Sequence, residues 1–164
     1  MRAGAGARWR LEVGVMAWLA VMTLAGCDIP HKPRAPHAGV QVQMRLVDPQ
    51  QQGTYHYQGR QLALKEPPLV TSADIIDVRI VKDTAGQPAM RFRMREETKD
   101  RLLAATEAAV GQQMAVTVDQ RVLTVATVYG PFAEDMQIAG MVMTADEVQA
   151  MVRHITDGGP QPLR

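Results

Sequence analysis

The only cysteine of the chain, Cys27, directly follows a short apolar run, and this limits what the first part of the chain can become. The run extends from Val13 to Leu24 and is preceded by three basic residues, Arg2, Arg8 and Arg10. About a dozen apolar residues are too few to cross a bilayer as a lasting helix, which needs roughly 20. A basic start followed by such a run is typical of a secretory signal, so the sequence predicts export.

Residues 24–27, Leu-Ala-Gly-Cys, resemble the bacterial lipobox, in which the cysteine thiol is acylated and becomes the first mature residue. The sequence therefore predicts a lipoprotein signal peptide over residues 1–26 and an acylated Cys27 that anchors the chain to the cell envelope, facing the periplasm. An ordinary signal peptide with a chance cysteine and an uncleaved anchor are the alternatives. The next residue, Asp28, resembles the signal that retains enterobacterial lipoproteins in the inner membrane.

The part of the chain after residue 26 is close to electrically neutral. Removing residues 1–26 leaves 15 basic and 16 acidic residues, with no basic block. This balance argues against nucleic acid as a partner. The remaining length of about 138 residues is enough for one domain with one core. An exported chain with one cysteine has no disulfide framework, and acylation accounts for the leftover thiol.

Prolines separate a tether from the folded part of the chain. Residues 27–39 contain three prolines and two histidines, and this proline density disfavours a helix and favours an extended spacer. We expect this tether to hold the domain off the membrane, with its histidines solvated and not bound to a metal. The folded domain is expected over residues 40–157, and residues 158–164 are expected to be a disordered tail.

Alternating apolar and polar residues predict strands through most of the folded part, as in residues 40–46, Val-Gln-Val-Gln-Met-Arg-Leu. Two stretches have helical signals instead. The first is 95–110, with an apolar stripe. The second begins at Thr144, where a capping box precedes an apolar face, and Gly158-Gly159 end it. The pattern predicts an α+β fold, a mostly antiparallel sheet of about six or seven strands with two helices packed on one side. The strands are expected at 40–46, 61–64, 78–82, 88–94, 113–118, 122–128 and 136–139.

Catalytic and metal-binding patterns are missing from the sequence. It has no glycine-rich phosphate loop, no HExxH, no CxxC and no nucleophile elbow. His154 is expected at the surface or at a helix end, and His56 in a loop flanked by tyrosines, where binding is conceivable but a plain loop is favoured. The methionines could suggest a copper site, but their positions favour core filling. We therefore expect no enzyme, no metal, no cofactor and no small-molecule substrate.

Seven segments together form a recognisable pattern through their order, spacing and residue types: 43–48, 69–75, 86–92, 110–119, 122–128, 138–140 and 144–150. This pattern resembles the head subdomain of the large first periplasmic domain of SecD, the membrane subunit that assists protein export. The similarity covers roughly residues 41–156. It implies the fold of that subdomain and binding of polypeptide.

The chain departs from the SecD pattern at three places. The membrane-spanning helices of SecD are absent from it, so we expect a domain that stands alone and is no translocation motor. Asp119-Gln120 replaces the Asp-Gly hairpin turn of the family. Residues 130–135, Gly-Pro-Phe-Ala-Glu-Asp, replace a glycine-rich link, and partner contacts are expected to have diverged in this loop.

The sequence thus favours a non-catalytic periplasmic binding module that contacts unfolded or translocating polypeptide, or an envelope protein complex. The alternatives are an immunity or inhibitor lipoprotein that neutralises a periplasm-acting toxin, and a structural aid to assembly of an envelope complex. The residues expected to bind the partner are exposed apolar or loop positions: Tyr55, Tyr57, Tyr129, Pro131 and Phe132.

Overall fold

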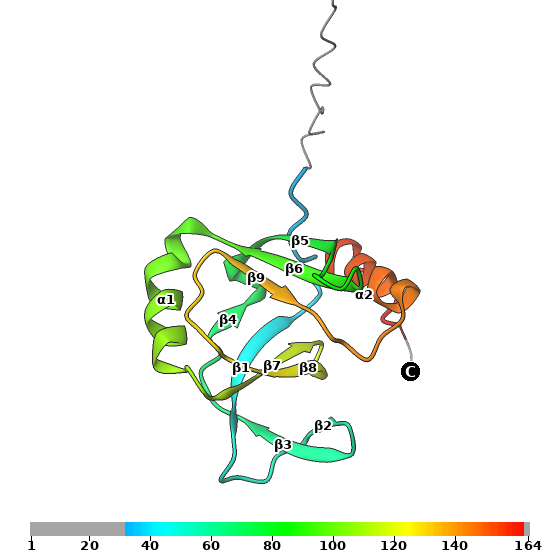
Figure 1. The fold of residues 1–164 in the computed structure, drawn as a ribbon. Coiled ribbons are helices and arrows are strands. Elements are labelled where there is room, and N and C mark those ends of the chain that lie inside the picture. The colour runs from blue at the N-terminus through cyan, green and yellow to red at the C-terminus, as the bar shows by residue number, and fades with distance from the viewer. Residues whose placement is uncertain (1–31, 163–164) are drawn as a thin grey trace, which may run out of the picture. The chain divides into compact units, whose positions relative to one another are not determined.

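The computed structural model describes residues 32–162, and the predicted signal peptide, Cys27 and Asp28 lie outside them. The described chain forms two antiparallel sheets and two α-helices (Figure 1). The larger sheet has the strand order β2-β3-β1-β7-β8, and β4 also pairs with β1. Its strands are β1 (Val42–Asp48), β2 (Tyr55–Tyr57), β3 (Arg60–Leu64), β4 (Val70–Thr71), β7 (Gln113–Val118) and β8 (Arg121–Thr127).

The smaller sheet has the order β5-β6-β9, and helix α2 packs against its first two strands. The predicted α+β class, with antiparallel pairing and two α-helices, is confirmed. The strands of residues 32–162 number nine in two sheets, because two short segments pair that were expected to be loops. The remaining elements are β5 (Ile75–Lys82), β6 (Pro88–Met94), β9 (Asp135–Ile138), α1 (Lys99–Ala108), α2 (Ala145–Asp157) and the 3-10 turns η1 (Ser72–Asp74) and η2 (Glu96–Thr98).

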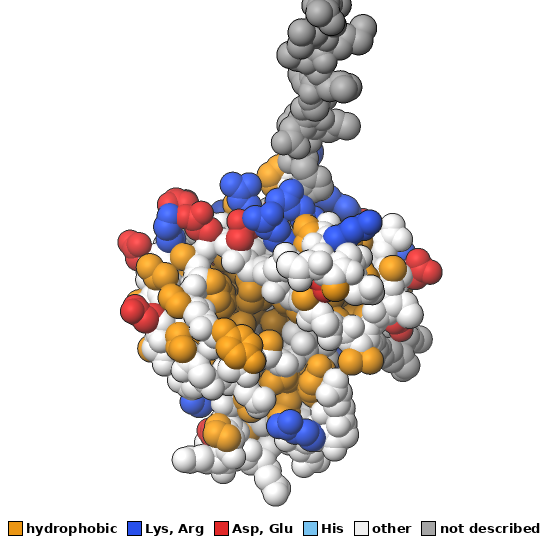
Figure 2. All heavy atoms as spheres, in the orientation of Figure 1, with side chains coloured by type: hydrophobic (Ala, Val, Ile, Leu, Met, Phe, Trp, Pro, Cys, Tyr) orange, Lys and Arg blue, Asp and Glu red, His pale blue; other side chains and the backbone are white. Residues whose placement is uncertain are grey.

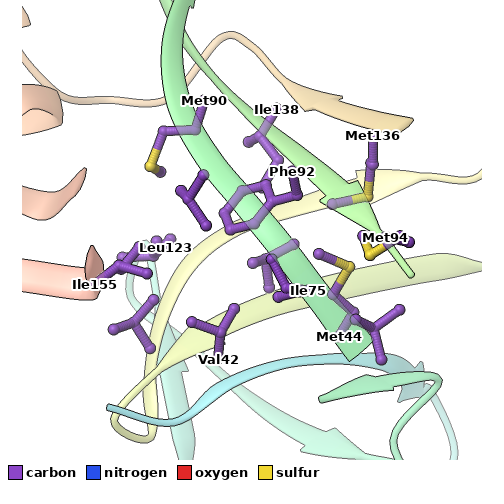
Figure 3. Packing of buried hydrophobic residues seen from close by; sticks show 14 of the residues in the cluster. Val42, Met44, Ile75, Met90, Phe92, Met94, Leu123, Met136, Ile138 and Ile155 are labelled. Atoms are coloured by element: carbon purple, nitrogen blue, oxygen red, sulfur yellow. The ribbon is translucent and has the colours of Figure 1, made fainter. Parts of the chain in front are cut away.

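The two sheets enclose one apolar core, to which α1 and α2 also contribute side chains. Phe92 of β6 is completely buried at its centre, beside Ile138, Met136 and Met94 (Figure 3). On the opposite side of the core, Met44 of β1 is also fully buried. Methionine side chains have several flexible torsions and fill irregular gaps between the layers, as the sequence predicted for these residues.

A second, smaller cluster lies on the other face of the larger sheet. It consists of Val47, Leu62, Ala115 and Val122, with Tyr55 and Tyr57 packed against it among the partly buried residues. The β2–β3 hairpin therefore covers this face. Gln58 and Gly59 have φ angles of 49° and 74°, the positive values that a two-residue type I′ turn requires. This turn explains why residues 55–57 form a strand instead of the expected loop.

Helix α2 begins and ends where the sequence signals predicted. The Thr144 hydroxyl accepts a hydrogen bond from the backbone N–H of Glu147, and the Glu147 carboxylate accepts one from the backbone N–H of Thr144 at 2.7 Å. Gly158 closes the helix with a φ of 69°, a conformation that glycine adopts without the clash of a Cβ atom. Helix α1 is shorter than expected, since residues 96–98 form a 3-10 turn and the helix ends at Ala108.

The folded domain begins before residue 40, unlike the expected boundary. The backbone N–H of Arg34 donates to Asp77 Oδ1 at 2.9 Å, and the backbone O of Arg34 accepts from the N–H of Val78 at 2.9 Å. His37 donates its N–H to the carbonyl of Ile155. The described part of the expected tether is therefore attached along β5, because that strand leaves one edge unpaired by its sheet.

The chain after α2 also makes specific contacts. Arg121 donates to the backbone O of Pro162 at 2.6 Å, and Gln161 donates to the backbone O of Val118 at 3.3 Å. His154, expected at the surface or at a helix end, lies in the last turn of α2 with only 7% of its area exposed. Residues 158–162 are thus hydrogen-bonded to the domain, in contrast to the expected disordered tail.

Candidate functional site

A groove of about 170 Å³ lies between β8 and β9, where the two sheets present their end strands to each other. We call it the β8–β9 groove. Figure 2 shows hydrophobic side chains gathered in the middle of this face of the molecule. No charged side chain lines the groove, so its walls favour an uncharged occupant. The central lining residues are Met114, Val116, Thr124, Ala126, Met136 and Ile138.

Both strands beside the groove have one unoccupied edge. Among residues 32–162, β8 pairs only with β7, and β9 pairs only with β6. An end strand presents a row of backbone N–H and C=O groups that can pair with another extended chain. The groove therefore combines an apolar floor with backbone hydrogen-bonding groups along its sides.

Residues 129–134 form a loop that closes one end of the groove, and α1 holds this loop in place. The hydroxyl of Thr106, which is fully buried, accepts from the backbone N–H of Phe132 at 3.0 Å and lies 2.9 Å from the backbone O of the same residue. Two ion pairs hold the end of the loop. Lys99 pairs with Glu134, and Arg91 forms a two-point contact with Asp135.

These ion pairs also stabilise the charged forms of the two basic side chains. A hydrogen bond and the negative charge of Asp135 raise the pKa of Arg91, and those of Glu134 raise the pKa of Lys99. The Lys99 pair is exposed to solvent, and exposed pairs add little stability. The contact of Thr106 with the Phe132 backbone is a buried attachment of the loop that does not depend on exposed charges.

Replacing Thr106 by valine should loosen this loop. Valine has nearly the same shape as threonine but cannot bond the Phe132 N–H, so we expect the free energy of unfolding to fall by about 1–2 kcal/mol. Urea unfolding measures this loss, and hydrogen exchange should become faster for residues 129–134. Thr106→Ser keeps the hydroxyl and is the matched control. Unchanged exchange in the valine variant would contradict this role of Thr106.

The structure brings three of the five predicted binding residues to this groove and its continuation. Tyr129 and Phe132 line the groove, and the side chain of Tyr129 is 90% exposed. A second depression, lined by Tyr57 and Arg60, shares Thr124 and Ala126 with the groove and so continues it toward the β2–β3 hairpin.

The other two predicted residues do not line it. Pro131 is exposed in the loop between Tyr129 and Phe132. Tyr55 packs over the small cluster under the β2–β3 hairpin. His56, on the same strand, has only a long contact of 3.5 Å with Gln61.

Sequence reasoning missed the residues of the groove walls. Thr124 and Ala126 were predicted only as part of a strand, and their small size is the one signal that could have pointed to an open site. Met136 and Ile138 were expected as strand residues as well. Their shared groove depends on which strands end each sheet, and a strand pattern does not contain that information.

Within residues 32–162, no three of the side chains His, Cys, Asp and Glu come together as a possible metal site. In the same range, no helix is long and apolar enough to span a membrane.

Sequence comparison finds protein translocase subunits among the relatives. The chain is 28% identical over 108 residues to the protein translocase subunit SecD of Aquifex aeolicus and 31% identical over 88 residues to that of Rhodobacter capsulatus. These matches cover 65% and 54% of this chain. They cover only 21% and 15% of the relatives, so the chain spans about a fifth or less of their length.

Solved structures share the fold. A SecDF crystal structure in the super-membrane-facing form superposes with a TM-score of 0.57 at 20% identity, over 76% of this chain and 19% of the other. A second structure, of a SecDF membrane component that enhances protein export, covers 81% of this chain and 70% of its own, with a TM-score of 0.53 at 22% identity. Residues 47–158 match the family model described as SecDF, P1 head subdomain, and the chain therefore belongs to this family.

Proposed function

We propose that this chain is a non-catalytic, lipid-anchored periplasmic domain that binds an extended, uncharged segment of polypeptide in the β8–β9 groove. The observation that carries the proposal is an uncharged groove between two free sheet edges, with Tyr129 exposed at its end. The relatives are protein translocase subunits, which handle polypeptide, and this supports the same class of ligand.

The groove suits an extended chain better than a folded partner. An added strand gains affinity from backbone hydrogen bonds and selectivity from pockets for alternate side chains. β9 has four residues, so one strand along it would place about two side chains on the apolar floor. Such a site recognises an unfolded apolar stretch with little dependence on its sequence, as a polypeptide in transit requires.

The anchor belongs to the proposal as well. The lipobox-like residues 24–27 support acylation of Cys27 at the periplasmic side, and Asp28 supports the inner membrane. One acyl chain binds a membrane reversibly, whereas the two or three chains of a bacterial lipoprotein hold it stably. The domain would then stay close to chains that emerge from the membrane.

Photocrosslinking in cells tests the groove. A photoreactive phenylalanine analogue at Tyr129 or Phe132 should form adducts with unfolded export substrates. The same analogue at Gln51, which is exposed in the loop before β2, should give at least fivefold less product. Tyr129 is almost fully exposed, so its replacement leaves the fold intact. Equal yields from Tyr129 and Gln51, or adducts with one folded protein alone, would refute polypeptide binding in the groove.

The last outcome would favour the inhibitor alternative, which predicts one toxin as the partner. The relatives reported above are export subunits, and they favour the first proposal over this one.

A further inference from the structure

The outer face of the smaller sheet carries a concentration of basic side chains. Val78, Met90 and Phe92 of β5 and β6 belong to the core, so the alternate residues of these strands point away from it. Arg79 lies opposite Arg91 on this outer face, and the next pair along is Asp77 with Arg93.

The first described residues extend this face. Arg34 is bonded through its backbone to β5, and its guanidinium pairs with Asp157 of α2. Lys32 precedes it and is exposed. Figure 2 shows Lys and Arg side chains gathered over this part of the molecule. We define the basic face as Lys32, Arg34, Arg79, Arg91 and Arg93.

The carboxylates within this region do not cancel its charge. Asp77 pairs with Arg79, Asp135 with Arg91 and Asp157 with Arg34. Five cations and three carboxylates leave a net charge of about +2 on the face. The chain after residue 26 has 15 basic and 16 acidic residues, so this excess does not follow from the overall composition. It is a local separation of charge.

We propose that the basic face rests on the anionic phospholipid surface of the membrane to which Cys27 is anchored. This inference depends on the acylation of Cys27 in the proposed function, but not on the ligand of the groove. Only five residue steps separate Cys27 from Lys32. A fully extended chain covers at most about 3.6 Å per step, so the anchor lies within about 18 Å of the start of the folded domain.

The prolines were expected to hold the domain away from the membrane. In this proposal the free part of the tether is too short to do so, and the domain stays close to the surface. Surface charges act over roughly a Debye length, about 8–10 Å at physiological salt. The reach of the tether is about twice this distance at most, so the anchored domain can bring its basic face close enough for the lipid charges to attract it. Lys32 and Arg34 belong both to the basic face and to the first described residues, so this is the face closest to the anchor along the chain.

The strength of the attraction favours a membrane over other anionic partners. Each Lys or Arg near an anionic bilayer contributes roughly a fivefold gain in affinity, so a net charge of about +2 gives only weak binding. Nucleic-acid binding needs more phosphate contacts than this face provides. Weak binding is enough to orient the domain when an anchor already holds it beside the surface, because the local concentration of that surface is then high. The acylated Cys27 would supply this anchor for the membrane and for no other anionic partner.

The docked orientation would leave the remaining surface accessible. The β2–β3 hairpin lies at the end of the domain opposite the first described segment, which is blue in Figure 1. The β8–β9 groove lies on the side between these two ends, open in the view of Figure 2. A domain resting on its basic face would hold the groove parallel to the membrane, a short distance above it.

Vesicle anchoring tests the orientation directly. Residues 27–164 contain one cysteine and no tryptophan, so the Cys27 thiol can be coupled to a maleimide lipid and a single tryptophan can serve as the probe. Val81→Trp places it on the outer face of β5, and Gln51→Trp places it in the loop before β2. Phosphatidylcholine carrying a nitroxide on its headgroup quenches tryptophan that touches the surface.

We expect at least twofold stronger quenching of Trp fluorescence in the Val81→Trp protein when vesicles contain 30% phosphatidylglycerol than when they contain phosphatidylcholine alone. The Gln51→Trp protein should show no such difference, and 0.5 M salt should abolish it. Equal quenching in neutral and anionic vesicles, or equal quenching of the two probes, would overturn the proposal. No quenching of either probe would also overturn it and leave an acidic protein as the occupant of the face.

Charge reversal separates the basic face from total charge. The double variant Lys32→Glu with Arg93→Glu should remove the effect of anionic lipid on quenching. The control is Arg60→Glu with Lys65→Glu, at the first residue of β3 and directly after that strand. It changes the net charge by the same amount and should retain the effect. Palmitate labelling of the wild type against Cys27→Ser tests the anchor by itself. Absence of palmitate label from the wild type would show that the anchor is missing. That result, like failure of crosslinking in the groove, is distinguishable from failure of the basic face to bind anionic lipid.

Discussion

Replacing Phe92 by alanine should lower the free energy of unfolding by about 3–5 kcal/mol, the range for truncating a fully buried aromatic ring. Phe92 has no exposed area and lies where β6 meets both β9 and the interior of the larger sheet. The cavity left by the ring cannot collapse easily, because two sheets fix its walls. The melting temperature should fall by roughly 10–20 °C for a domain of this size.

Two controls separate this effect from unrelated losses. Phe92→Leu retains most of the apolar volume and should cost less than half as much. Tyr129→Ala removes a ring that is 90% exposed and should change the free energy of unfolding by no more than about 0.5 kcal/mol. Thermal and urea unfolding measure all three variants. A loss below about 1 kcal/mol for Phe92→Ala would mean that the two sheets do not share the core described here.

Replacing His154 by alanine should cost about 2–3 kcal/mol, because it removes a buried polar contact that joins three parts of the chain. The Nε2 atom of His154 lies 2.7 Å from Asp119 Oδ2, and Nδ1 faces the carbonyl of Gly159. Asp119 in turn accepts from the backbone N–H of Gln41 at 2.8 Å. The variant leaves the Asp119 carboxylate with one fewer donor and releases the end of α2 from the β7–β8 turn.

A double-mutant cycle tests whether the two side chains act together. His154→Ala, Asp119→Ala and the double variant should give a coupling energy above about 1 kcal/mol in urea unfolding. His56→Ala is the matched control, since His56 is exposed on β2 and should be close to neutral. Additive effects of His154 and Asp119 would show that the contact contributes nothing of its own.

Local signals in the sequence predicted much of the secondary structure correctly. Thr144 with Glu147 and Gly158 marked both ends of α2, because helix caps depend on side chains and φ angles within a few residues. Alternation placed β1 and β6, since every second residue of a half-buried strand must be apolar. The order of the matching segments also indicated the SecD family, which the family comparison confirms for residues 47–158.

Features that depend on distant parts of the chain were predicted less well. The attachment of Arg34 to β5 depends on a strand more than 40 residues away, so the proline pattern alone indicated a free tether. The strand at Val70–Thr71 exists because β1 offers it a pairing edge. Helix α1 ends at Ala108 and leaves Val110 half exposed, although the apolar stripe predicted a longer buried helix.

The candidate site was also predicted only in part from the sequence. Tyr129 and Phe132 were predicted as exposed apolar or loop positions, and both line the groove. Tyr55 looked equivalent to Tyr57 in the sequence, yet only Tyr57 reaches the depression that continues the groove. The two tyrosines are two residues apart and point to the same face of β2, so the difference comes from their place along the strand. Tyr57 adjoins the hairpin turn, where Gln58 and Arg60 also line the depression, and the sequence does not show where along the hairpin that depression lies.

By itself, the sequence determined the strand and helix periods, the helix caps and the family relationship, and it predicts the acylated Cys27. These properties depend on neighbouring residues or on the order of segments along the chain. Only the tertiary structure decided that β8 and β9 end separate sheets and form a groove, and that five basic residues share a face next to the tether. A strand pattern specifies which side chains are buried, whereas the neighbours of each strand are chosen by the packing of the whole core.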